Sequence, residues 1–173
     1  MQEFKIKNSP NFSTRENGKI SMIVIHSISL PPSKFGDNYI EDFFLNRLDC
    51  DKHPYFKTIK NLKVSAHLLI KRNGETIQFV DFDKKAWHAG KSFYSGLDNC
   101  NEFSIGIELE GADNIQYTEE QYSQLDEILV LLIKKYPIKY IVGHNEIAPA
   151  RKTDPGTAFK WSKLLQGKIN EYK

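Results

Sequence analysis

The sequence predicts a single domain of the α/β class, and three patterns support this prediction. Residues 20–25 and 140–142 form short runs rich in β-branched and aromatic side chains, which is typical of buried strands. Residues 64–71 and 103–110 alternate between two sets of side chains, as strands with two distinct faces do. Residues 118–133 instead repeat apolar side chains at helical spacing. Strand and helix patterns that follow one another along a chain favour an α/β fold.

Length and composition are those of an ordinary globular protein. The 173 residues suffice for one domain with its own core, and 40% of them are hydrophobic while 27% are charged. A net charge of +2 is too small to favour nucleic acid or a membrane surface as a partner, so we expect neither. The sequence contains no repeat, low-complexity tract or linker, and residues 1–173 are therefore expected to form one domain and a monomer.

The expected location is the cytoplasm. Residues 1–8 contain no apolar core of signal-peptide length, and no later run is long enough to span a bilayer. Cys50 and Cys100 lie far apart in the sequence and belong to no paired motif, so we expect free thiols in a reducing compartment. A single disulfide between them is the alternative.

The first part of the chain leads up to a histidine. Residues 1–19 are rich in polar residues and turn formers and are expected to wrap the surface. The strand at 20–25 is expected to be buried on both faces and to end at His26. Residues 38–48 carry an apolar helical face and predict a short amphipathic helix, whereas residues 49–62 are expected to form a loop.

A hairpin and a long loop are predicted next. The alternating strand at 64–71 is followed by Asn73-Gly74, the pair that a type I′ turn prefers, and by a returning strand at 75–80. Residues 81–101 then form a polar and aromatic stretch, which we expect to be a loop. Loops of this length without their own secondary structure are often functional.

The strand at 103–110 places Gly106 and Glu108 on one face and its apolar side chains on the other. A carboxylate near a glycine on a strand face indicates room for something to approach the backbone. The alternative is that this face is a solvent-exposed edge of the sheet, and the pattern by itself favours neither interpretation.

The second half contains the longest predicted helix. Thr118 and Gln121 form a capping box at its start, and Pro137 is expected to end it. Between them, apolar residues form one core-facing stripe. The apolar residues within 159–165 predict a final helix that packs on the sheet.

The segment that follows the last strand groups polar residues. His144 comes directly after the strand at 140–142, at the carboxyl end where open α/β sheets place their ligands. Pro155 holds Asp154 in an extended conformation, so Lys152 and Asp154 are expected to point to the same side. His26 ends an earlier buried strand in the same way. The alternatives are two unrelated core histidines and an Asp-Pro-Gly turn.

These residues have the chemistry of a metal site. Zinc binds imidazole nitrogen together with thiolate sulfur or carboxylate oxygen, and a catalytic zinc keeps its fourth position for water. His26, His144 and Asp154 are the right three residue types. They are not arranged as a short contiguous motif, so their spacing alone is a weak signal.

Five ordered blocks resemble a known family of zinc amidases: residues 24–32, 64–67, 86–90, 103–111 and 143–156. The family is that of the type 2 N-acetylmuramoyl-L-alanine amidases, related to phage amidase lysozymes and to peptidoglycan recognition proteins. Within it, the chain is most similar to the cytoplasmic 1,6-anhydro-N-acetylmuramyl-L-alanine amidases of cell-wall recycling. The resemblance covers about residues 20–165 and implies a catalytic core with a mixed central β-sheet flanked by helices.

The resemblance also implies a role for each matching residue. His26, His144 and Asp154 would bind one Zn²⁺, Glu108 would activate the water, and Lys152 would stabilise the intermediate. His67 is expected near the metal as a structural residue behind the ligands.

Substrate contacts are predicted at three positions. Trp87 is expected to offer a face for the sugar, and Arg151 to meet a carboxylate of the peptide. Ser27 adjoins the first ligand, where close relatives usually have asparagine, and Lys63 stands where arginine is expected. These two departures affect fine substrate contacts and leave the reaction unchanged.

The implied reaction is hydrolysis of the amide between the lactyl group of muramic acid and L-alanine, with a small muropeptide as substrate. Two alternatives stay open. One is a lytic amidase, periplasmic or phage-derived, that cuts intact peptidoglycan. The other is a non-catalytic muropeptide recognition module, which the presence of all three ligand residues disfavours.

Overall fold

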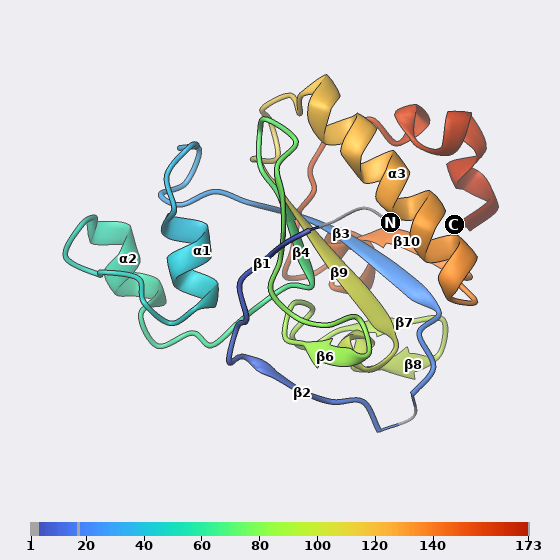
Figure 1. Ribbon diagram of the computed structural model, residues 1–173, viewed down its shortest axis with the longest axis horizontal. Coiled ribbons are helices and arrows are strands. Elements are labelled where there is room, and N and C mark those ends of the chain that lie inside the picture. The colour runs from blue at the N-terminus through green and yellow to red at the C-terminus, as the bar shows by residue number, and fades with distance from the viewer. Residues whose placement is uncertain (1–3, 17, 173) are drawn as a thin grey trace.

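The computed structural model describes residues 4–16 and 18–172, which form a central sheet with helices on its faces (Figure 1). The sheet is mixed and has six strands in the order β1-β5-β4-β9-β3-β10. This is the predicted α/β class with a mixed central sheet. In chain order its strands are β1 (Lys5–Ile6), β3 (Met22–Ile28), β4 (Leu68–Ile70), β5 (Thr76–Gln78), β9 (Ser104–Glu110) and β10 (Tyr140–Gly143).

The two longest strands, β3 and β9, pair in parallel at the centre of the sheet. Every residue of β9 is buried, so the solvent-exposed edge considered for 103–110 is wrong. Strand β3 also continues beyond the predicted end: His26 lies inside it, opposite Glu108 of β9. The strand is longer than its apolar run because the neighbouring strand offers a full ladder of hydrogen-bonding partners.

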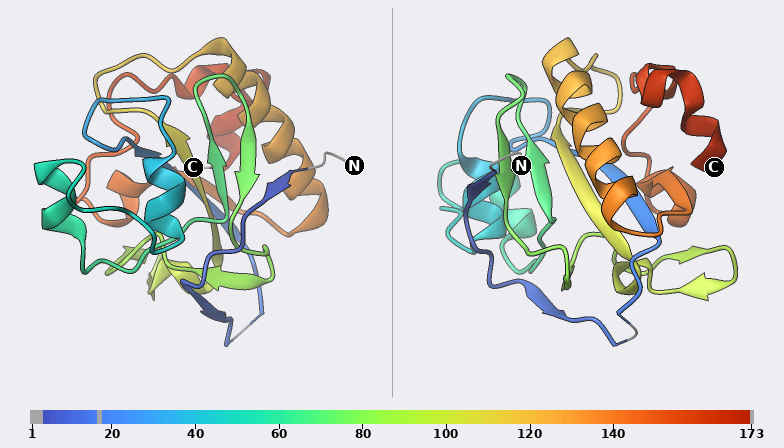
Figure 2. Two further views of the ribbon diagram at one scale, coloured as in Figure 1. Left: turned by 60° about the vertical axis from the view of Figure 1, so that its left-hand side comes forward. Right: turned by 45° about the vertical axis from the view of Figure 1, so that its right-hand side comes forward.

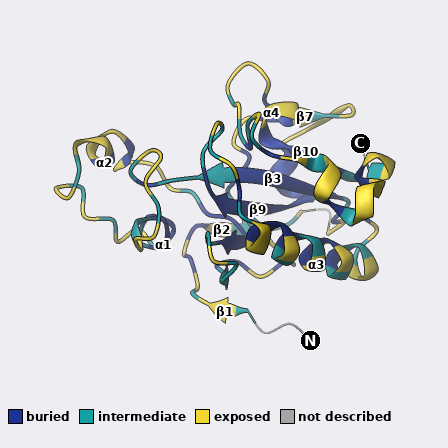
Figure 3. Ribbon diagram, turned by 90° about the horizontal axis from the view of Figure 1, so that it is seen from above, coloured by how far each residue is buried: buried dark blue, intermediate teal, exposed yellow. Residues whose placement is uncertain are grey.

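The two faces of the sheet carry different layers. Helix α3 (Glu119–Lys135) covers one face, where its apolar stripe meets the odd-numbered core residues of β3 and β9 such as Ile25 and Ile107 (Figures 2 and 3). The capping box at Thr118 is present, and the helix ends before Pro137 as predicted. On the other face, Met22 and Val24 pack against residues of the segments that precede β9 and follow β10. His26 and Glu108 share the alternation of this second face.

A small lobe of two helices lies beside the sheet (Figure 1). Helix α1 (Tyr39–Phe44) is shorter than the predicted helix at 38–48. Helix α2 (Pro54–Ile59) was expected to be loop, and that prediction is wrong. Its proline occupies the first turn, where no backbone donor is needed, and the side chain of His53 accepts a hydrogen bond from the Tyr55 amide as the cap.

The segment between residues 71 and 101 departs from prediction in two ways. The hairpin of β4 and β5 forms, but its turn is not type I′: Gly74 has a positive φ and Asn73 does not. The Gly74 amide donates to the Lys71 carbonyl, so the hairpin loop is one residue longer than the predicted two-residue turn. The stretch 81–101 is not a bare loop, because it contains β6 (Lys84–Ala86), β7 (Phe93–Tyr94) and β8 (Leu97–Asp98). Strand β6 pairs with β2 (Phe12–Thr14), a long-range partner that local patterns do not reveal.

The end of the chain also differs from prediction. In place of one α-helix there are two 3₁₀ segments, Trp161–Lys163 and Leu165–Tyr172. Leu165 and Gln166 have positive φ values, which an α-helix does not tolerate. The apolar side chains still reach the core, since Phe159 and Leu164 are buried beside α3.

Two further expectations concern the compartment. Cys50 and Cys100 are both free thiols, as predicted. In the described part of the chain, no helix has the length and apolar character needed to cross a membrane.

The capping box gives a first testable prediction. The Thr118 hydroxyl accepts from the Gln121 amide and donates to the Arg72 carbonyl, so it ties the start of α3 to the β4–β5 hairpin. Thr118→Val keeps the shape and loses both bonds, and is expected to lower the free energy of unfolding by about 1–2 kcal/mol. Thr118→Ser keeps the hydroxyl and is the matched control, expected within about 0.5 kcal/mol of the parent. Urea unfolding measures both, and equal stabilities of the two variants would contradict the assignment.

Candidate metal centre and active site

A cavity of about 550 Å³ opens at the carboxyl ends of β3 and β9, between the sheet and the α1–α2 lobe. One wall is polar and is formed by β3, β9 and the loop after α4 (His144–Ile147). The opposite wall is largely apolar and comes from the lobe and the segment that follows it. Its apolar residues are Leu30, Phe43, Phe44, Tyr55, Ile59, Leu62 and Val64.

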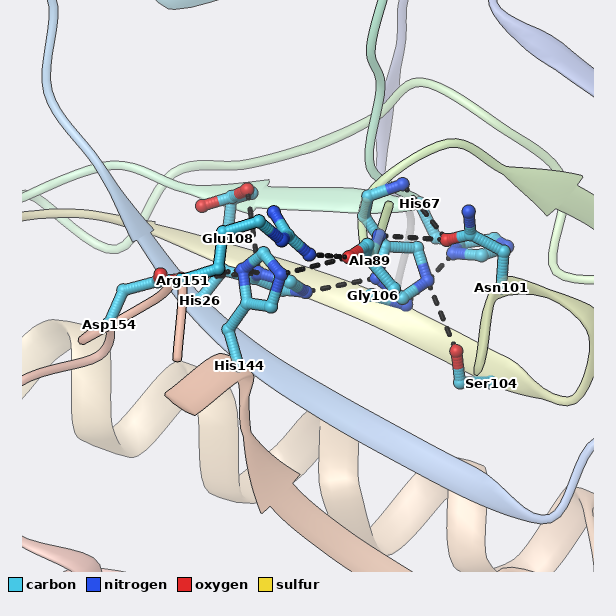
Figure 4. A network of polar contacts seen from close by, with 11 residues as sticks. His26, His67, Ala89, Asn101, Ser104, Gly106, Glu108, His144, Arg151 and Asp154 are labelled. Carbon is cyan, nitrogen blue, oxygen red and sulfur yellow. Dashed lines mark hydrogen bonds and ion pairs between the residues drawn. The ribbon is translucent and has the colours of Figure 1, made fainter. Parts of the chain in front are cut away.

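The three predicted ligands meet in the polar wall (Figure 4). The Nδ1 atoms of His26 and His144 are 2.9 Å apart, and each lies 3.2 Å from Oδ2 of Asp154. His26 comes from β3, while His144 begins the short helix α4 after β10. Asp154 is placed by its backbone, because its carbonyl accepts a hydrogen bond from the Asn145 amide.

The outer nitrogens of both rings have polar partners, and that of His144 fixes its tautomer. Nε2 of His144 lies 3.1 Å from the Ala89 carbonyl, which can only accept, so this nitrogen carries the proton. Nε2 of His26 lies 2.9 Å from Nδ1 of His88. With these outer nitrogens protonated, both Nδ1 lone pairs face the common point between the three ligand atoms.

Burial sets the charges of this group. Desolvation lowers the pKa of His26 to about 4, so its imidazole is neutral at neutral pH. Burial alone would raise the pKa of Asp154, but the adjacent imidazoles of His144 and His26 outweigh it and hold the pKa well below the ordinary value. A neutral imidazole beside an ionised carboxylate is the state in which these side chains bind a metal.

The donor set fits a zinc ion. Bonds of 2.0–2.1 Å in a tetrahedral arrangement place ligand atoms about 3.3 Å apart. The three observed separations of 2.9–3.2 Å come close to that value. Three protein ligands with one side open to a cavity are also the pattern of a catalytic rather than a structural zinc.

Glu108 lies directly beside the three ligands. Its Oε1 is 3.9 Å from Nδ1 of His26, and its buried Oε2 has no hydrogen-bond partner among the residues that the structure describes. Burial and the charge of Asp154 raise the pKa of Glu108 well above its ordinary value, against the opposing effect of Lys152. A buried carboxyl with a free oxygen and a raised pKa is suited to accept and release a proton.

Lys152, Ser27 and Trp87 also line the cavity, and their predicted roles in catalysis and substrate contact stay predictions. Lys152 additionally borders a neighbouring cavity of about 490 Å³ on its far side. Lys152 and Asp154 line the same cavity, which agrees with the prediction that they point to the same side. The indole Nε1–H of Trp87 donates a hydrogen bond to Oγ of Ser13.

Arg151 and His67 lie elsewhere. The Arg151 guanidinium donates to the carbonyls of Ala89 and Lys91, each at 2.7 Å, and the side chain is not among the described residues that line the cavity. Its predicted contact with a peptide carboxylate therefore stays a prediction. Nδ1 of His67 accepts from the Gly106 amide, and its ring centre is 5.7 Å from that of His88, so His67 is one ring removed from His26. The histidine that touches a ligand is His88, for which the sequence analysis gave no role.

Comparison with protein families matches residues 16–157 to the family described as N-acetylmuramoyl-L-alanine amidase. The 1,6-anhydro-N-acetylmuramyl-L-alanine amidase AmpD of Salmonella typhimurium is 51% identical over 159 residues, which cover 90% of this chain and 85% of the relative. A crystal structure of a selenomethionine AmpD derivative superimposes with a TM-score of 0.92 at 48% identity, covering 95% of this chain and 93% of that one.

A more distant solved structure contains a bound substrate. It is the complex of the N-acetylmuramyl-L-alanine amidase AmiD from E. coli with anhydro-N-acetylmuramic acid-L-Ala-D-γ-Glu-L-Lys. The similarity has a TM-score of 0.62 at 30% identity, and covers 87% of this chain and 58% of that chain.

The burial of His67 predicts a specific acid sensitivity of the metal-free protein. Desolvation lowers the pKa of His67 to about 3, whereas an unfolded imidazole titrates at about 6.5. Between these values the unfolded state binds the extra proton, so stability is lost as the pH falls through this window, by up to about 1.4 kcal/mol per pH unit. His67→Asn keeps an acceptor for the Gly106 amide and removes the titration.

Urea unfolding of both proteins without metal at pH 7 and pH 5 measures this difference. The parent is expected to lose more stability between the two pH values than His67→Asn. Other buried histidines titrate in both proteins, and their contribution cancels in the comparison. Parallel losses in the two proteins would show that His67 is not held neutral.

Proposed function

This chain belongs to the N-acetylmuramoyl-L-alanine amidase family, and from that membership and its site we propose a zinc-dependent amidase of peptidoglycan recycling. The reaction is hydrolysis of the amide between the lactyl group of 1,6-anhydro-N-acetylmuramic acid and the L-alanine of the stem peptide. The observation that carries the proposal is the convergence of His26, His144, Asp154 and Glu108 at one end of the sheet.

His26, His144 and Asp154 are proposed to hold one Zn²⁺ through Nδ1, Nδ1 and Oδ2. When bound, zinc lowers the pKa of water toward neutrality and polarises a carbonyl group. The protein contributes two imidazoles, one carboxylate and an open side toward the cavity. These are the ligand types and the geometry that such a site requires.

Glu108 is proposed as the general base and then the general acid. Its partnerless Oε2 can accept the proton of the attacking water, and its raised pKa favours keeping that proton until the amine leaves. Lys152 is proposed to stabilise the negative charge that develops on the carbonyl oxygen. Its ammonium is suited to this role because it borders the same cavity and influences Glu108 electrostatically.

The shape of the cavity supports a small muropeptide as substrate. The amide is proposed to lie against the polar wall, with Trp87 offering a face to the sugar and Ser27 a hydroxyl near the first ligand. Arg151 is proposed to meet a peptide carboxylate outside the cavity, with the guanidinium hydrogens that Ala89 and Lys91 leave available. The match to 1,6-anhydro amidases supports the anhydro sugar in particular.

We place the protein in the cytoplasm and propose that it acts as a monomer. Two free thiols are in keeping with a reducing compartment.

Two variants separate the proposed base from the proposed ligands. Glu108→Gln is expected to keep one zinc per chain and to lose about 10²–10⁴-fold in turnover. Asp154→Ala removes a ligand and is expected to lose both zinc and activity. Elemental analysis with single-turnover assays measures both properties. Full zinc occupancy in Asp154→Ala would refute the ligand assignment, and near-normal turnover of zinc-loaded Glu108→Gln would refute the base.

A substrate comparison tests the place of the enzyme in recycling. We expect a higher kcat/KM for 1,6-anhydro-muramyl-tripeptide than for the reducing muramyl-tripeptide, with little release from purified sacculi. A compact domain that binds through one cavity gains no avidity on a polymer. Efficient solubilisation of sacculi without preference for the anhydro sugar would instead identify a lytic amidase, and binding without hydrolysis a recognition module.

A further inference from the structure

We propose that His88 is a positioning residue that orients His26 for metal binding. It is not itself a ligand: its Nδ1 lies 2.9 Å from Nε2 of His26, the nitrogen that points away from the other two ligands. The inference rests on the proposed metal site and adds to it a residue that decides which tautomer of His26 is present.

The hydrogen bonds of Ser104 determine which nitrogen of His88 carries the proton. Ser104 donates its hydroxyl proton to the Cys100 carbonyl at 2.5 Å, which leaves the oxygen to accept from Nε2–H of His88 at 3.2 Å. With Nε2 protonated, Nδ1 of a neutral His88 is an acceptor, so the proton between the two rings belongs to Nε2 of His26. Nδ1 of His26 is then unprotonated and free to bind a metal.

The fold makes space for this ring. A Cβ on Gly106 would lie 2.3 Å from Cγ of His88, so only glycine at this position lets the imidazole lie on β9. The space inferred from Gly106 in the sequence is therefore occupied by a side chain of the protein. The backbone of the segment is fixed as well, because Oδ1 of Asn101 accepts from the amides of His88 and Ala89 (Figure 4).

One segment thus supports both histidine ligands. His88 accepts from His26 through its side chain, and the next residue, Ala89, accepts from His144 through its carbonyl. The Arg151 guanidinium binds the same carbonyl and holds the segment against the loop of Asp154. A partner behind each imidazole is what sets ring orientation and metal affinity, and losing one typically costs 10–100-fold in affinity.

The test uses two nearly isosteric replacements. His88→Asn keeps an acceptor oxygen close to the position of Nδ1, whereas His88→Leu removes it. Zinc affinity, measured on the full chain by competition with a chromogenic chelator, is expected to fall about 10–100-fold in His88→Leu and only a few-fold in His88→Asn. Urea unfolding of the metal-free variants is expected to give the opposite order, since leucine suits a buried site better than asparagine.

The opposite orders distinguish positioning from packing. A residue that only fills space would make the apo-stable His88→Leu the better zinc binder, which would overturn the proposal. Equal zinc affinities of the two variants would overturn it too. His67→Asn and His67→Leu are the matched controls at a neighbouring buried histidine, and both are expected to bind zinc within about threefold of the parent.

Ser104→Ala covers the case in which the His88 variants do not fold. It keeps His88 in place but removes the acceptor of its Nε2 proton, and a several-fold loss of zinc affinity is expected. An unchanged affinity in Ser104→Ala would then overturn the proposal. His144→Ala is the control for failure of the metal site itself. If the parent binds zinc no better than His144→Ala, the proposed function fails. If the parent binds zinc tightly, the results for the His88 and Ser104 variants decide the inference.

Discussion

The in-register pairing of β3 with β9 is the constraint on which the site depends. It sets His26 opposite Glu108, so a proposed ligand and the proposed base project from neighbouring strands on one face. A slip of one residue would turn one of these side chains toward α3. The register is strongly specified because the alternate residues of both strands are buried beneath that helix, where a polar side chain would find no partner. Hydrophobic packing on one face thus fixes the geometry of the chemistry on the other.

Burial of the polar group then sets its electrostatics. Desolvation keeps His26 neutral and raises the pKa of Glu108, while the adjacent imidazoles keep the pKa of Asp154 low. A site open to water would hold none of these shifts, and an amidase that uses one carboxyl as a ligand and another as a proton carrier needs the two to differ. The same burial requires that each imidazole nitrogen has a hydrogen-bond partner. His88 and Ala89 supply these partners to His26 and His144.

The family assignment and the geometry of the candidate site agree with each other. The amidase family covers residues 16–157, and that range contains α3, the polar wall and every strand of the central sheet except β1. Two residues differ from expectation: Ser27 lines the cavity, whereas Lys63 lines a separate small one, and neither is a proposed ligand. The chain is therefore an N-acetylmuramoyl-L-alanine amidase, as its match to the family and to its relatives shows.

Local sequence patterns determined the class of fold, the central strands and helix α3 with its cap, whereas the candidate ligands were assigned by resemblance to a family. These features depend on periodicity or on motifs within a few residues, so the sequence contains them directly. The tertiary structure alone decided that α2 forms, that the stretch 81–101 contains strands, and that His88 rather than His67 contacts His26. These outcomes depend on partners far away in the chain: His88 is 62 residues from His26, and Ala89 is 55 residues from His144. No local pattern records which side chain a buried imidazole will meet, because that choice is made when strands and loops pack together.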